Sequence, residues 1–158
     1  MIASSRERLR LLLETVELEA RHLNETDRRL FEQPFSAARA TALRTDELLA
    51  ERVDAFAARF ARLQDAAGDK LLPVFLECLG EPVGSVLDNL DRAARLGLLV
   101  QTSDDWIAAR ALQNRMVREC IRDAALLAEA LNEDHRVVPM LMAFVQACDA
   151  YAIARKLN

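Results

Sequence analysis

The sequence predicts an all-α fold, an antiparallel up-and-down bundle of four to five helices. Of the 158 residues, 52% are hydrophobic but only 5% are aromatic, and four glycines and four prolines leave little material for tight turns. Alanine, leucine, arginine and glutamate dominate, and these residues are strong helix formers. A β-rich fold would need more β-branched residues, more tyrosine and more turn residues. The length fits a single domain over residues 1–158 that can bury a real core.

The first helix is expected to begin at Ser4 or Ser5, because a serine hydroxyl can cap the free N–H groups of a first turn. Apolar residues then follow at near-helical spacing to about Glu32. The helix should stop before the first proline, since the residue before a proline resists the α conformation. Residues 34–45 are expected to form a connection, with one short turn of helix at 36–42.

The second helix has the clearest pattern in the chain. Thr45 or Asp46 is expected to cap it, and Gly80 to end it. Gly68 and Pro73 fall inside the pattern, so a kink or break is expected between them. The apolar residues step by three or four positions throughout: Leu49, Val53, Phe56, Phe60, Leu63, Ala67, Leu71, Val74 and Cys78.

Two shorter helices are expected next. Ser85 is placed to cap the third helix, and Gly97 is placed to end it in the left-handed conformation that glycine adopts readily. Thr102 or Ser103 is expected to cap the fourth helix, whose first turn carries two aspartates that suit the positive end of the helix dipole.

The last helical region is expected over residues 123–156. Pro139 fits the first turn of a helix better than its middle, because proline has no backbone N–H. The sequence therefore predicts that a new helix begins at Asp134.

Charge and cysteine content restrict the function and the compartment. The net charge of −4 and the isoelectric point near 5.3 argue against a strongly basic nucleic-acid binder. Cys78, Cys120 and Cys148 are far apart in apolar surroundings, which is typical of buried free thiols in a cytosolic protein. No apolar leader begins the sequence, and no run approaches 18 apolar residues. We therefore expect a cytoplasmic protein without a membrane span.

Catalytic and metal-binding motifs are missing from the sequence. It contains no glycine-rich nucleotide loop, no HExxH and no GxSxG. The two histidines, His22 and His135, lie far apart among charged residues, so we expect both on the solvent-exposed surface. No metal and no cofactor is predicted.

Two aspartates lie on one face of the second helix. Asp65 and Asp69 are four residues apart, so they could hold a metal or share a proton. Arg62 and Lys70 are near in sequence and can pair with them. The favoured interpretation is a solvated, salt-bridged face.

A polar stripe runs along the fourth helix. Arg110, Asn114 and Arg118 lie at positions i, i+4 and i+8, with Gln113 beside them. Guanidinium groups match phosphate or carboxylate oxygens, and an amide can fix the orientation of the ligand. The alternative is an ordinary charged helix face with Glu119 close by, and spacing alone favours that alternative.

The segment DDWIAARALQNRMVREC resembles the signature helix of the HEPN-type helical proteins, which include the HepT-like toxins and the small nucleotidyltransferase substrate-binding proteins. The stretches LDNLDRAARLGLL and ERVDAFAARFARLQDAAGDKLLP before it, and IRDAALLAEAL after it, resemble the neighbouring helices of that family. The resemblance covers most of residues 46–131. The matching signature positions are Trp106, Arg110, Leu112, Asn114, Val117 and Glu119.

This resemblance implies a homodimeric four- or five-helix bundle. Active members are metal-independent ribonucleases that use an arginine and a histidine, and HepT-like members pair with a small nucleotidyltransferase that modifies the following tyrosine. Here the three positions hold Gln113, Arg118 and Cys120. Arginine cannot exchange protons near neutral pH, and glutamine lacks the charge that would stabilise a phosphorane-like state.

Three functions follow from these observations. The first is a non-catalytic binding protein that pairs with a small nucleotidyltransferase in a toxin–antitoxin-like pair, with nucleotide or RNA phosphate as a further ligand of the stripe. The second is a ribonuclease toxin with an altered site, in which Arg110, Asn114 and Arg118 stabilise charge while another residue moves the proton. The third is an adaptor bundle unrelated to the family.

Overall fold

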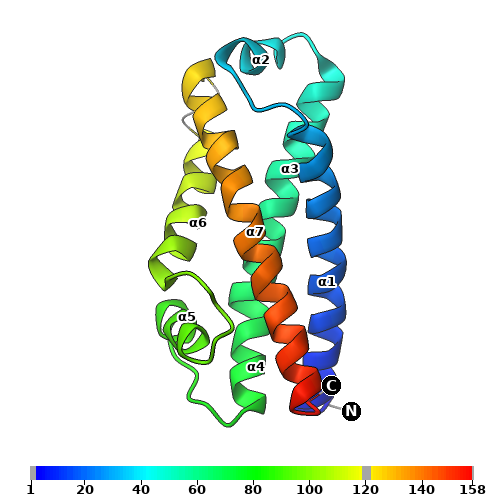
Figure 1. The fold of residues 1–158 in the computed structure, drawn as a ribbon, viewed down its shortest axis with the longest axis vertical. Helices are drawn as coiled ribbons and strands as arrows, with labels where there is room; N and C mark the ends of the chain where they lie inside the picture. The colour runs from blue at the N-terminus through cyan, green and yellow to red at the C-terminus, as the bar shows by residue number, and fades with distance from the viewer. Residues whose placement is uncertain (1–2, 119–121, 158) are drawn as a thin grey trace.

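The computed structural model describes residues 3–118 and 122–157, and every regular element in these ranges is a helix (Figure 1). The prediction of an all-α bundle is therefore confirmed. The elements are α1 (Ser5–Leu30), α2 (Ala37–Ala42), α3 (Glu47–Asp65), the π-helix η1 (Ala66–Leu71), α4 (Leu72–Cys78), α5 (Val86–Arg95), α6 (Ser103–Arg118) and α7 (Ala124–Ala154).

Four columns make up the bundle: α1, the α3–η1–α4 column, α6 and α7 (Figure 1). Neighbouring columns run in opposite directions along the long axis. The first column packs against α3 and α7, and α6 also packs against α3 and α7. The columns therefore stand in the order α1, α3, α6, α7 around the bundle. As a result, the α1–α7 groove and the α3–α6 groove lie on opposite sides of the molecule.

Most of the residues predicted to cap helices do form N-caps in the structure. The Ser4 hydroxyl accepts a hydrogen bond from the Glu7 backbone N–H, and the Asp46 carboxylate accepts one from Leu49. Ser85 forms a reciprocal capping box with the third residue of its helix. These bonds satisfy N–H groups that have no partner inside the helix. The largest side chains buried between the columns are Trp106, Phe56, Phe60, Phe75 and Phe144.

The kink predicted near Gly68 and Pro73 is a π-helix. The backbone N–H of Leu72 donates to the carbonyl of Ala67, five residues earlier, so the turn is one residue wider than an α-turn. Pro73 stands at the start of α4, just after this wide turn. A proline ring clashes with the preceding helical turn and cannot donate a backbone hydrogen bond. The wide turn therefore lets the column continue past the proline instead of breaking.

The prediction of a new helix at Asp134 is wrong. One helix, α7, runs unbroken from Ala124 to Ala154, with Asp123 as its cap and Pro139 in its interior. Pro139 is exposed, so water can reach the carbonyl that its missing N–H leaves unpaired. Buried side chains on both sides of the proline hold the helix against the rest of the bundle.

By length and composition alone, α7 is long and apolar enough to cross a membrane. Core helices of globular proteins meet the same test. In this bundle, α7 packs against α1, α2 and α6, and it buries side chains from Leu127 to Ala152.

Candidate functional site

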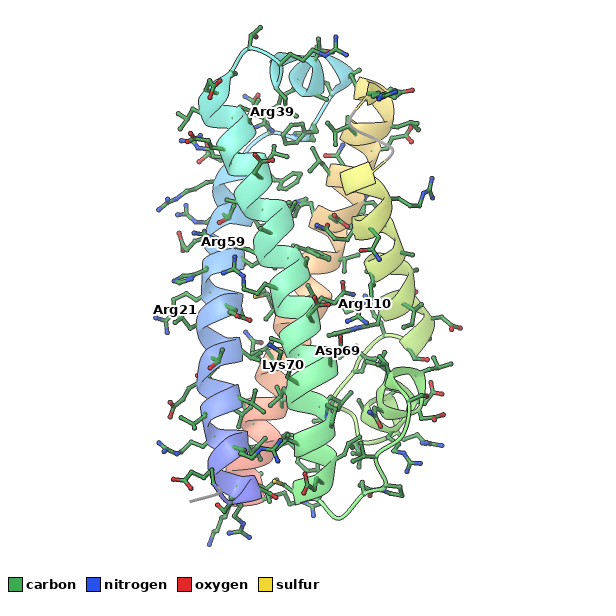
Figure 2. The ribbon with its side chains drawn as sticks, turned by 180° about the vertical axis from the view of Figure 1, so that it is seen from behind. Arg21, Arg39, Arg59, Asp69, Lys70 and Arg110 are labelled. Carbon is green, nitrogen blue, oxygen red and sulfur yellow. The ribbon has the colours of Figure 1, made fainter. Side chains whose placement is uncertain are left out.

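The strongest polar contact of the predicted stripe lies in the α3–α6 groove. Arg110 reaches from α6 across to the second column, and its Nη2 lies 3.0 Å from Asp65 Oδ1 and 2.9 Å from Asp69 Oδ2 (Figure 2). Both aspartates are thus salt-bridged, as the sequence predicted, but Arg110 is their partner instead of the nearby Arg62 and Lys70. The contact joins residues more than 40 positions apart.

Other bonds fix α6 against the same column. The Gln64 side chain donates from Nε2 to the backbone carbonyl of Trp106 at 2.9 Å. One turn further on, Gly68 packs directly against the Trp106 indole. These contacts lie on both sides of the start of η1, which also contains Asp69.

Gln113 belongs to the core and not to the exposed stripe. Its side chain is buried, and Nε2 donates to the backbone carbonyl of Ala57 on α3 at 2.8 Å. Asn114, by contrast, is exposed. Arg118 ends α6, and its side chain lies outside what the structure describes, as does all of Cys120. Of the four predicted ligand residues, Arg110 and Gln113 face α3, and Asn114 is left on the surface.

This geometry makes the predicted binding of phosphate at Arg110 less favourable. The Arg110 side chain is only 26% exposed, and its charge is shared between two carboxylates. A phosphate at Arg110 would have to displace both ion pairs and then lie beside two negative charges. The arrangement therefore stabilises the α3–α6 contact better than it binds an anion.

Replacing Arg110 with alanine is expected to lower the free energy of unfolding by about 1 kcal/mol, because it leaves two carboxylates unpaired on one face. The aspartates are 61% and 40% exposed, so water limits the effect. Urea denaturation of Arg110→Ala, of Asp65→Asn with Asp69→Asn, and of the triple variant would measure the coupling. Strictly additive losses would contradict an ion-paired cluster.

A second polar cluster lies in the α1–α7 groove, where the sequence indicated only surface. His135 Nδ1 lies 2.7 Å from Asp27 Oδ1, and the imidazole stacks on Phe31 with ring centroids 4.3 Å apart. The side chain of His135 is 44% exposed, so it reaches the surface as predicted, but the sequence did not indicate its contacts with Asp27 and Phe31. Burial raises the pKa of Asp27, and the bond to His135 opposes that rise. His22 is exposed.

The two polar clusters do not meet. Arg110 lies in the α3–α6 groove and His135 in the α1–α7 groove, on opposite sides of the bundle. A ribonuclease site needs a proton-transferring group and a charge-stabilising group around one phosphate. The described part of the chain therefore does not bring the stripe and the oriented histidine to one substrate.

The described ranges contain two free thiols and no cluster of metal-binding side chains. No group of three or more His, Cys, Asp or Glu side chains there could hold a metal ion. Cys148 is a buried free thiol, and Cys78 is a free thiol that is only partly buried. Burial raises the pKa of both thiols, which disfavours their thiolate forms.

A comparison of the chain with models of known protein families, with curated proteins and with solved structures finds no match.

Proposed function

We propose that this protein is a non-catalytic helical binding protein whose partner is a small nucleotidyltransferase, in a toxin–antitoxin-like pair. The resemblance of residues 46–131 to HEPN-type proteins motivates the choice of partner and a homodimeric state. The observation that carries the non-catalytic role is the engagement of Arg110 by Asp65 and Asp69.

One of the positions that would do chemistry in the family has a structural contact in the described part of this bundle. Gln113, at the position of the catalytic arginine, donates to the Ala57 carbonyl and so ties α6 to α3. Arg118, at the position of the catalytic histidine, has a pKa far too high for proton transfer. Trp106 and Leu112 pack in or against the core. A retained scaffold with a replaced site suits a protein that binds.

The test is co-expression with the product of the adjacent gene. Size-exclusion chromatography with light scattering is expected to show a stoichiometric complex of a dimer of this chain with a nucleotidyltransferase, and the isolated protein is expected to leave RNA intact. Arg118→Ala serves as the matched variant for any residual cleavage. RNA cleavage by the wild type that Arg118→Ala abolishes would overturn the non-catalytic role. A chain that ignores the nucleotidyltransferase would overturn the choice of partner.

A further inference from the structure

An open groove of about 510 Å³ runs between the first half of α1 and the η1–α4 segment. Its lining is mostly apolar, with Leu11 and Leu12 from α1 and Pro73 and Val74 from α4. Leu11 is 50% exposed. The groove therefore leaves apolar surface in contact with water.

A second exposed leucine lies beyond the lining of the groove on α1. Leu18 is 48% exposed and lies seven residues after Leu11, so both leucines point to the same side of the helix. Seven residues of α-helix span about 10 Å. A partner helix that lies in a groove typically anchors apolar side chains at positions i, i+3, i+4 and i+7, which matches this length. The core does not need these leucines, because Leu9 and Leu13 fill the inner face of α1.

The charges at the rim of the groove are basic. Arg8 and Lys70 both line it and are exposed, and neither has an ion pair within 4 Å among the residues that the structure describes (Figure 2 shows Lys70). The acidic lining residue, Asp69, shares Arg110 with Asp65, so its charge is only partly neutralised. With two basic residues and one carboxylate, the lining of the groove has a net positive formal charge.

We infer that this groove binds an amphipathic helix of a partner protein that carries glutamate or aspartate beside its apolar residues. Leucine-rich surface provides the contact area, and Arg8 and Lys70 select carboxylates at its edges. The inference rests on the proposed function for its partner-binding role, but it does not depend on the partner being a nucleotidyltransferase.

Two helical peptides with the same leucine spacing, one flanked by glutamates and one by lysines, provide the probe. Fluorescence anisotropy is expected to show roughly tenfold tighter binding of the acidic peptide at low salt, with a smaller difference at high salt. The double variant Arg8→Glu with Lys70→Glu should reverse the preference, and Leu11→Asp should abolish binding. Circular dichroism would establish that each variant folds.

Leu48→Asp is the matched control, because Leu48 is a 58% exposed leucine at the start of α3, at the other end of the bundle. It should bind the acidic peptide like the wild type. Equal binding of both peptides, or binding that survives Leu11→Asp, overturns the inference. A wild-type dimer that Leu11→Asp dissociates would place a second copy in the groove, and binding to anionic vesicles without peptide binding would place a membrane there. Failure of the peptide test leaves the nucleotidyltransferase complex to be judged separately.

Discussion

Replacing Asp134 with leucine is expected to raise the free energy of unfolding at pH 8 by up to about 4 kcal/mol. Asp134 is fully buried in α7, and neither of its carboxyl oxygens has a hydrogen-bond partner among the described residues. Burial, with a smaller contribution from the neighbouring charge of Glu133, raises its pKa from 3.8 to about 7. Each pKa unit corresponds to about 1.4 kcal/mol, so the ionised form is costly to bury.

The sign of the pH dependence follows from this rise in the pKa of Asp134. The folded protein holds the Asp134 proton more tightly than the unfolded chain, so the contribution of Asp134 to the free energy of unfolding is greatest below about pH 4 and falls as the pH rises toward 7. The advantage of Asp134→Leu should therefore shrink by roughly 2–3 kcal/mol between pH 8 and pH 5. Urea denaturation at both pH values would measure it. Glu133→Leu, at an exposed neighbouring site, should show a much smaller pH dependence, because the charge of Glu133 is only the lesser cause of the raised pKa of Asp134. An equal difference for Asp134→Leu at both pH values would contradict a buried, titrating carboxyl.

Local patterns were enough to predict most of the helical framework. Ser4, Asp46 and Ser85 cap their helices as expected, because a cap needs only a side-chain oxygen and N–H groups two or three residues away. Gly97 likewise adopts a positive φ of 77° after α5, where the sequence placed a helix end. Each of these features is determined within a few residues, so the sequence pattern contains the necessary information.

The end of the bundle near Asp134 shows where local patterns mislead. The low helix propensity of proline favoured a break near Pro139, but the burial of side chains along α7 outweighs that preference. One signal was present: Asp134 lies three residues after Leu131 and four before Val138, so it falls within an apolar helical stripe. Reading that spacing as one continuous helix would have placed the carboxyl in the core.

The polar contacts between columns could not be predicted from the sequence, for a different reason. His135 and Asp27 are 108 residues apart, and Gln113 finds its acceptor 56 residues away. Such pairs depend on the order of the columns around the bundle and on their relative heights. Helical spacing within one segment determines neither of these. The stripe was correctly placed on one helix, but which neighbour Arg110 would face could not be deduced from α6 alone.

Replacing Gly68 with valine is expected to lower the free energy of unfolding by about 2–3 kcal/mol, because the added side chain would overpack the core. A Cβ at Gly68 would lie 3.1 Å from Cζ2 and 3.2 Å from Nε1 of Trp106. The surroundings oppose a shift of the indole, since Trp106 is fully buried and packs against Phe144 in a T-shaped pair with ring centroids 5.1 Å apart. Thermal or urea denaturation would measure the loss.

Trp106→Phe separates this steric cost from the effect of glycine on the backbone. Alanine in a helix interior is about 1 kcal/mol better than glycine, so Gly68→Ala combines a gain with a clash. In the Trp106→Phe background the indole atoms nearest to the new Cβ are gone. Gly68→Ala should therefore be neutral or stabilising there, although it costs stability in the wild type. Equal effects in both backgrounds would show that the tryptophan does not require the glycine. A nonzero coupling would show that Gly68 is needed because the Trp106 indole approaches its Cα so closely.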